Sequence, residues 1–340
     1  MSYDSILLVS FGGPEGPDDV MPFLENVLRG KNVPRERLLE VAGHYQSFGG
    51  ISPINGQCRA LIRALRAELD AHEILLPIYW GNRNWEPMLE DTLRQMMADG
   101  KQHALAFFTS MFSCYSGCRQ YRENVHAAQI KVGPGAPSVD KLRMAYNHPG
   151  FIEPQAELLQ MMLAKVAPER CASTPVLFCA HSIPMSMAEN SRYQQQLLEA
   201  CRLVAERAGH TRWELVFQSR SGSPQQPWLA PDVCDRIEQL HEAENLSDVV
   251  LHPIGFISDH MEVIYDLDDE AAKLCEENQI RFYRVPTVGT HPRFVSMIRE
   301  LIVERLSPGA PKSALGQYGP NHDLCPENCC LYPQTARPAR

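Results

Sequence analysis

Hydrophobic and polar positions divide the chain into two alternating kinds of segment. Short, continuous apolar runs are bounded by Gly, Pro, Ser or Asn, as is typical of strands buried on both faces of a parallel sheet. Between these runs, apolar residues recur at the spacing of an amphipathic helix. The pattern predicts strands at 5–11, 74–79, 104–109, 141–144, 176–180, 214–218, 248–254 and 281–285.

The helical pattern fills most of the intervals between these strands. Helices are predicted at 18–29, 57–70, 86–98, 118–128, 152–166, 193–208, 231–242, from about 262 onward, and at 292–306. Residues 30–55 are expected to form a long loop, which in a compact domain is usually functional or a lid.

The alternation of strand and helix is interrupted near residue 147, which divides the chain into two sets of elements. The expected fold class is α/β, with two doubly wound, Rossmann-like domains built on parallel sheets. Their predicted ranges are 1–146 and 147–306, followed by a Pro/Gly-rich, cysteine-containing tail at 307–340.

Composition and charge restrict the class of protein, its expected location and its expected partners. The chain has 340 residues, 44% of them hydrophobic and 21% charged, as in a soluble enzyme. No apolar run reaches the roughly 20 residues that span a bilayer, and the N-terminus lacks a signal-peptide pattern, so a cytoplasmic location is expected. The net charge of −9, without a basic cluster, argues against nucleic acid as a partner.

The chain contains 11 cysteines. An odd number without a secretion signal argues against a disulfide framework, and most of them lie in apolar segments as small core residues. Cys325, Cys329 and Cys330 differ, because three thiols within a few residues suggest a metal or an iron–sulfur cluster. The alternative is an unstructured tail whose thiols are incidental.

Acidic residues follow the predicted strand 248–254. Glu262, Asp266 and Glu270 have the i, i+4, i+8 spacing that places side chains on one helix face. They begin at the carboxyl end of a parallel strand, where open α/β sheets bind their ligands. Because the carboxylates repel one another, a basic neighbour or a cation is expected opposite them. The alternative is an ordinary solvated helix face.

Two further strand ends carry polar residues. His181 directly follows strand 176–180, so its imidazole and the Glu262 carboxylate meet at one sheet edge. This pair suits a borderline divalent metal such as Fe²⁺, or proton transfer, although a lone histidine is more often structural. Gln218 and Ser219 end the next strand, where they either bond a ligand or cap a turn. After the first strand, Gly12 and Gly13 could cradle a phosphate, but the spaced-glycine fingerprint is absent.

The chain resembles the ferrochelatase family, whose members insert Fe²⁺ into a porphyrin. The matching motifs follow the family's order at 8–14, 49–53, 180–184, 218–219 with 227–229, and 255–266. Segments 80–85 and 115–121 resemble the actinobacterial-type branch.

This resemblance implies roles for the acidic and imidazole groups. A cleft between the two domains would hold the macrocycle. His181 would take a pyrrole proton or bind iron, and Glu262 would complete the metal site. Asp266 and Glu270 would extend a path for iron and protons.

The resemblance also implies porphyrin contacts. Ser52 and Tyr121 align with porphyrin-contacting positions, and Arg29 could pair with a propionate. Phe11, Ser219 and Trp228 are further candidates for substrate binding. Phe11 lies where some relatives carry an iron-ligating tyrosine, a role that phenylalanine cannot take.

Some ferrochelatases hold a [2Fe–2S] cluster with three C-terminal cysteines and one internal cysteine. The resemblance therefore implies Cys325, Cys329 and Cys330 as ligands, together with Cys118 or Cys114. Cys118 is favoured over Cys114 because it lies in the motif shared with the actinobacterial-type branch.

Several activities stay open at the sequence level. The branch implies coproporphyrin III as substrate, with protoporphyrin IX as the nearest alternative. A porphyrin- or haem-binding carrier without insertion activity is another, although a carrier needs neither a base nor an acidic ridge. A cobalt or nickel chelatase of similar fold is a third. The expected partners are the porphyrin, ferrous iron and a downstream enzyme of the haem pathway.

Overall fold

The computed structural model describes residues 2–30, 33–221, 225–307 and 309–333. Residues 31–32 of the predicted loop, and residues 308 and 334–340 of the predicted tail, lie outside the described residues. No helix among the described residues is long and apolar enough to cross a membrane.

Two parallel four-stranded sheets form the framework of the molecule. The first has the strand order β2-β1-β3-β4 and the second β6-β5-β7-β8. Their bounds are β1 Ser5–Ser10, β2 Ile78–Asn82, β3 His103–Phe108, β4 Ser138–Lys141, β5 Val176–His181, β6 Trp213–Gln218, β7 Asp248–His252 and β8 Arg281–Arg284. Every residue of β1 and β7 is buried, as their continuous apolar runs require. The predicted α/β class is confirmed.

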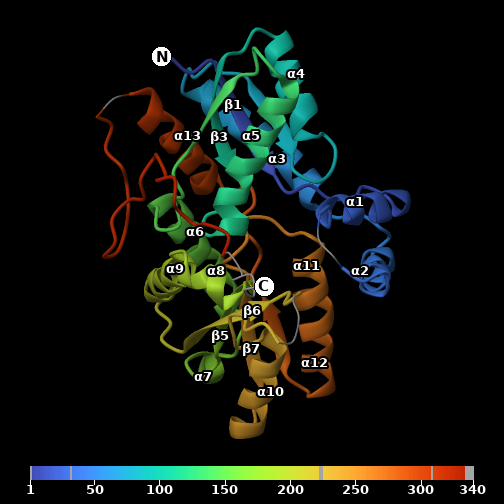
Figure 1. Ribbon diagram of the computed structural model, residues 1–340. Helices are drawn as coiled ribbons and strands as arrows, with labels where there is room; N and C mark the ends of the chain where they lie inside the picture. The colour runs from blue at the N-terminus through green and yellow to red at the C-terminus, as the bar shows by residue number, and fades with distance from the viewer. Residues whose placement is uncertain (1, 31–32, 222–224, 308, 334–340) are drawn as a thin grey trace.

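Helices cover both sheets, and Figure 1 shows the resulting two lobes, one above the other. The helices up to residue 132 are α1 Val20–Val27, α2 Arg35–Ser47, α3 Ile54–Ala71, α4 Leu89–Ala98 and α5 Gln120–Val132. The later ones are α6 Pro149–Leu163, α7 Pro168–Cys171, α8 Met185–Glu189, α9 Tyr193–Ala208, α10 Val233–Glu244, α12 Ala272–Glu277 and α13 Pro292–Leu306. α13 packs against both α3 and α6. The domain boundary near residue 147 stays a prediction.

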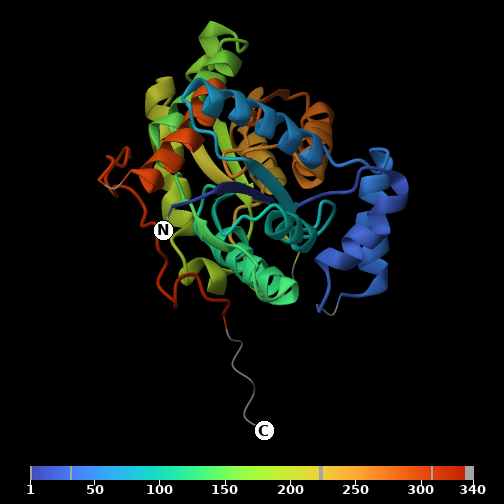
Figure 2. The same ribbon diagram turned by 90° about the horizontal axis from the view of Figure 1, so that it is seen from above.

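Two elements differ from the sequence pattern. The predicted loop at 30–55 contains the helix α2. α1 and α2 pack together and project from the side of the first lobe, as Figure 2 shows from above; we call this pair the cap. Strand β2 begins at Ile78, four residues after its predicted start. Leu75 in the predicted strand is 82% exposed, so its apolar side chain marks no buried position.

The predicted acidic helix is present, but its middle is not an α-helix. It begins with α11, Met261–Val263, continues as the π-helix η3, Ile264–Ala271, and ends in α12. A second π-helical turn, η2, spans Tyr115–Arg119 before α5. π-Helical turns are rare in proteins, and those that occur are often found at functional sites. The wider turn keeps Glu262, Asp266 and Glu270 on one helix but changes the angle between them.

Candidate active site and tail cysteines

His181 and Glu262 face each other at the carboxyl edge of the second sheet. His181 is the last residue of β5, paired with Gln218 of β6, and Glu262 lies in α11 after β7. His181 Nε2 is 3.5 Å from Glu262 Oε2, with the two side chains 33% and 48% exposed. His181 Nδ1 is 2.5 Å from the Ser182 carbonyl oxygen. Because a carbonyl only accepts, Nδ1 carries the proton, and the lone pair of Nε2 faces the carboxylate.

His260 is a third group at this site and was not among the predicted site residues. Its Nδ1 is 4.0 Å from Glu262 Oε2, and its ring contacts Phe256 at a centroid distance of 5.0 Å. Burial lowers the pKa of His260, so the ring stays neutral and can offer a nitrogen lone pair. The available signal was its position two residues before Glu262.

Asp266 lies behind Glu262 and is bound by the end of β6. Gln218 Nε2 donates to Asp266 Oδ2 at 3.1 Å, and the Ser219 hydroxyl donates to the same oxygen. Ser219 has a left-handed backbone, with φ of 60°. Burial, aided by the charges of Glu262 and Glu270, raises the pKa of Asp266 to about 7, against the Ser219 hydrogen bond. Asp266 can therefore exchange a proton near neutral pH.

On the first lobe, Ser52 lies in tight contact with the loop after β1. Its backbone nitrogen donates to the Pro14 carbonyl at 2.8 Å. A Cβ added to Gly13 would lie 2.7 Å from Ser52 Cβ, so only glycine permits this approach. Ile51 is 54% exposed beside Ser52, and its side chain is available as an apolar wall.

The rings of Phe11 and Tyr121 both lie near the guanidinium of Arg83, which was not among the predicted site residues. The guanidinium is 5.5 Å from the Phe11 ring centre and 4.4 Å from that of Tyr121. Tyr121 is buried and packs on Phe108. Asn124 holds Arg83 through a hydrogen bond of 2.6 Å. Arg83 follows the end of β2, a position that could have identified it.

The other two predicted substrate contacts are Arg29 and Trp228. Arg29 follows α1, is exposed, and donates from Nη2 to Asn26 Oδ1 at 2.5 Å. Trp228 is half-buried and forms an isolated bridge with Pro184. Its buried Nε1 has no hydrogen-bond partner within the described part of the chain. A ligand acceptor would satisfy this donor.

The cap contacts the second lobe beside Glu262. Met261 belongs to an apolar cluster with residues of α1 and α2, among them Phe23 and Tyr45. The His44 ring stacks on Tyr265 of η3, with centroids 3.9 Å apart and an interplanar angle of 9°. The cap is therefore joined to the helix that carries the acidic residues.

The tail brings its cysteines back to the start of α5. Cys118, in η2, lies beside Cys325, and the Cys118 thiol, with the charge of Lys141 and the neighbouring His322, lowers the pKa of Cys325 to about 4. Cys329 Sγ is 3.6 Å from Cys330 Sγ. Cys114 is engaged as a helix cap, because its sulfur accepts from Gly117 N at 3.1 Å.

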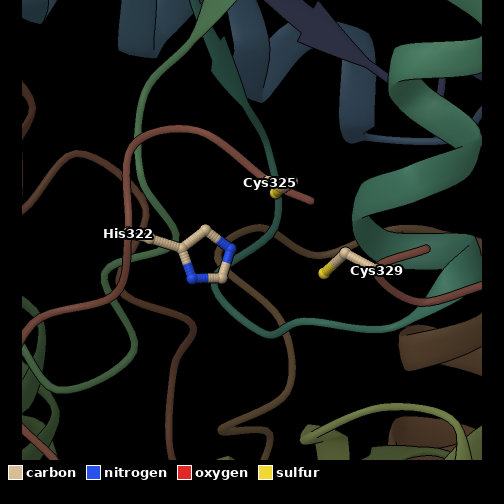
Figure 3. Close-up of side chains that lie close together, drawn as sticks. All are labelled: His322, Cys325 and Cys329. Carbon is tan, nitrogen blue, oxygen red and sulfur yellow. The ribbon is translucent and has the colours of Figure 1, made fainter. Parts of the chain in front are cut away.

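The ligand atoms of His322, Cys325 and Cys329 all lie within 4.8 Å of one another. Figure 3 shows the imidazole of His322 directed toward the space between the two sulfur atoms. Thiolates and imidazole are the donors that iron–sulfur and zinc sites use, so this set fits a metal centre. His322 was not among the predicted ligands.

Comparisons with known proteins agree on one family. The family model described as Ferrochelatase matches residues 3–306. A protein of Rhodopirellula baltica named "Ferrochelatase" is 62% identical over 97% of this chain and 94% of its own length. A Streptomyces coelicolor protein named "Coproporphyrin III ferrochelatase" is 49% identical over 96% of this chain and 93% of its own length.

Two solved structures with a similar fold are a chelatase and a protein described as similar to chelatases. The sirohydrochlorin chelatase SirB from Bacillus subtilis subspecies spizizenii, in complex with cobalt, has a TM-score of 0.52 at 10% identity, covering 88% of this chain and 96% of SirB. DR2241 from Deinococcus radiodurans, described as structurally similar to chelatases, has a TM-score of 0.53 at 15% identity, covering 89% of this chain and 55% of that protein. At these identities the likeness concerns the fold alone.

Proposed function

The chain belongs to the ferrochelatase family and is a metal chelatase, and we propose that its reaction is the insertion of Fe²⁺ into coproporphyrin III. The observation that carries this proposal is the free lone pair of His181 Nε2, directed at the Glu262 carboxylate with Asp266 behind it.

These groups match the chemistry of insertion. The free porphyrin must lose two pyrrole protons as Fe²⁺ replaces them. His181 Nε2 accepts the first, since its other nitrogen is already held protonated by Ser182. Glu262 supplies an oxygen ligand to the iron substrate, with His260 as a neighbouring nitrogen donor. Asp266, with its pKa near 7, takes up the second proton and passes it along the acidic helix through Glu270.

The macrocycle is proposed to lie between the lobes, with apolar walls and polar anchors. Phe11, Ile51 and Trp228 provide apolar surface, and Ser52 and Ser219 lie at the loop ends that border it. Propionates would be bound at the rim by Arg29 and by Arg83, which lies over Tyr121.

The preference for coproporphyrin III rests on relatives. The Streptomyces coelicolor and Nocardia farcinica relatives carry that substrate in their names, at 49% and 46% identity. Coproporphyrin III has two propionates where protoporphyrin IX has vinyls, so a basic rim favours the former.

The tail cysteines are proposed to hold a [2Fe–2S] cluster, as in some members of the family. The candidate thiol ligands are Cys118, Cys325, Cys329 and Cys330, and Cys118 is favoured over Cys114, whose sulfur already accepts from Gly117 N. When bound, such a cluster supplies a one-electron redox centre. No step of the insertion is assigned to it.

The decisive experiment is anaerobic insertion of Fe²⁺ into coproporphyrin III and protoporphyrin IX, measured side by side on purified protein. We expect insertion into both to be detectable and kcat/KM to be higher for coproporphyrin III. A higher value for protoporphyrin IX would overturn the substrate proposal and keep the chelatase. Tight binding of both porphyrins without insertion of any iron would instead favour a carrier.

A further inference from the structure

Five donor side chains meet where the tail returns to α5, one more than the proposed cluster needs. They are Cys118, His322, Cys325, Cys329 and Cys330. Only four can be ligands of one [2Fe–2S] centre, so the structure poses a choice between them.

Geometry favours His322 over Cys330. The ligand atoms of His322, Cys325 and Cys329 form a mutually close set, within 4.8 Å. Cys118 joins them through its contact with Cys325. Cys330 directly follows Cys329 in the sequence. It is buried, with 6% of its surface exposed, whereas His322 is exposed. The Cys330 backbone is left-handed, with φ of 53°, which is uncommon for a cysteine.

The segments that carry these donors are fixed by contacts that need no metal. Before His322, Asn321 Nδ2 donates to the Met144 carbonyl at 2.8 Å, and after it Asp323 pairs with Lys312. Arg119 Nη1 donates to the carbonyl oxygens of Glu327, at 2.6 Å, and Cys329, at 3.0 Å. These contacts hold the chain in place both before and after Cys325 in the sequence.

We propose that His322 is a ligand of the tail's metal centre, which then has a Cys₃His donor set of Cys118, His322, Cys325 and Cys329. Cys330 lies beside this set and does not bind the metal. This rests on the cluster proposed above. Imidazole can replace thiolate on one iron of a [2Fe–2S] centre, and such replacement raises the reduction potential.

The test uses full-length protein purified anaerobically, reduced with dithionite and examined by pulsed electron paramagnetic resonance. We expect strong coupling from one directly bound nitrogen, which changes when histidine is supplied as the ¹⁵N form. His322→Cys should keep the cluster but lose this coupling and lower the reduction potential. Cys330→Ala should keep both the cluster and the coupling.

Three results would overturn the proposal. One is the absence of strong nitrogen coupling in the unmodified protein, which would leave His322 as a hydrogen-bonding neighbour of Cys325. Another is coupling that persists in His322→Cys. The third is loss of the cluster in Cys330→Ala while His322→Ala keeps an unchanged spectrum.

A second measurement separates this proposal from that of the cluster. If the purified protein contains no iron and no sulfide, the cluster proposal fails, and Co²⁺ added to the thiol-reduced protein tests the donor set by itself. Thiolate-to-cobalt absorption distinguishes this site from the oxygen and nitrogen donors near Glu262. His322→Ala should weaken this Co²⁺ binding by at least about tenfold, whereas Cys330→Ala should not. The reverse order of effects would show that Cys330 is the ligand.

Discussion

The two nitrogens of His181 have different partners, and this difference sets what the residue can do. Nδ1 donates to Ser182, so Nε2 is the basic atom, 3.5 Å from Glu262. His181→Ala removes that base. We expect kcat for Fe²⁺ insertion to fall about 10²- to 10⁴-fold, the usual contribution of a general base. Anaerobic insertion assays measure it.

The matched control is His72→Ala, at an exposed position after α3. It should leave kcat unchanged. Porphyrin binding, followed by fluorescence, should persist in His181→Ala, because the apolar walls are intact. Full insertion rates in His181→Ala would refute the base assignment.

Asp266 should make stability depend on pH. Its pKa is raised to about 7, so between about pH 4 and 7 the native protein keeps a proton that the unfolded chain has released. Stability from this group is therefore present at low pH and is lost as pH rises toward 7. The side chain of Asp266→Asn is neutral at every pH. We therefore expect the stability of the variant, relative to that of the unmodified protein, to be higher at pH 8 than at pH 4.5.

Urea unfolding at the two pH values measures that difference. Ser219 and Gln218 contact the side chain, and Glu262, Glu270 and His181 contribute charge around it. A stability difference between the two proteins that is equal at pH 4.5 and pH 8 would contradict the raised pKa.

How far the sequence could predict these residues depends on where they lie. His181 was found because it directly follows a buried apolar run, and Glu262 because it begins an acidic ridge after another. His260 and Arg83 reach the site through burial and packing on Phe256 and Tyr121. Neither contact leaves a periodic trace in the chain. The same holds for His322, which reaches Cys325 only because the tail folds back.

At the level of elements, the loop after β1 and the start of α3 pack closely against each other at Gly13. A Cβ there would meet Ser52 Cβ at 2.7 Å and Ile54 Cγ2 at 2.8 Å. Gly13→Ala should cost about 1–3 kcal/mol, the usual penalty of overpacking, and should raise KM for the porphyrin. Urea unfolding and steady-state kinetics measure the two effects.

Gly16→Ala provides the control from the same loop. A Cβ on Gly16 would have no heavy atom within 4 Å. The stability of the Gly16→Ala variant and its KM for the porphyrin should match those of the unmodified protein. Equal effects of the two substitutions would mean that Ser52 and Ile54 can move away from an added Cβ at Gly13 without cost.

The cap and the acidic helix are joined by the stacked rings of His44 and Tyr265. Stacked aromatic pairs contribute about 0.5–1.5 kcal/mol beyond their buried area. His44→Ala should therefore loosen the cap and speed amide hydrogen exchange in α2, while exchange in α4 stays unchanged. Mass spectrometry of exchanged peptides measures both helices in one sample. Equal exchange in α2 of the two proteins would show that the apolar cluster around Met261 holds the cap without the stack.

Helices and strands were predictable where their apolar residues are buried and recur at the spacing of the element. The strands β1, β5 and β7, in which every residue except His181 is buried, were found close to their observed bounds. α2 was missed because only Ala42 and Tyr45 of its residues are buried, so it has almost no apolar face. The π-helix η3 could not be predicted, because the i, i+4, i+8 spacing of its acidic residues fits an ordinary α-helix equally well.

At the level of the whole molecule, α13 and the tail join parts of the chain that are far apart in sequence. Arg143, after β4, makes two hydrogen bonds to Glu304 of α13, at 2.7 and 2.9 Å, and a third to the Ser313 carbonyl in the tail. The two side chains are only 1% and 4% exposed. One buried ion pair therefore connects the first sheet, the last helix and the segment that leads to the tail cysteines.

Breaking this pair from one side should be costly, because it leaves a buried charge without its partner. Glu304→Gln should lower the free energy of unfolding by about 3–5 kcal/mol. Glu206→Gln removes a carboxylate that is 58% exposed and pairs with Arg202 within one helix, so it should change stability by less than about 1 kcal/mol. Urea unfolding of the three proteins at neutral pH measures both values. A loss in Glu304→Gln no larger than that in Glu206→Gln would mean that water reaches Arg143 and that the apolar packing of α13 on α3 and α6 holds the lobes together without it.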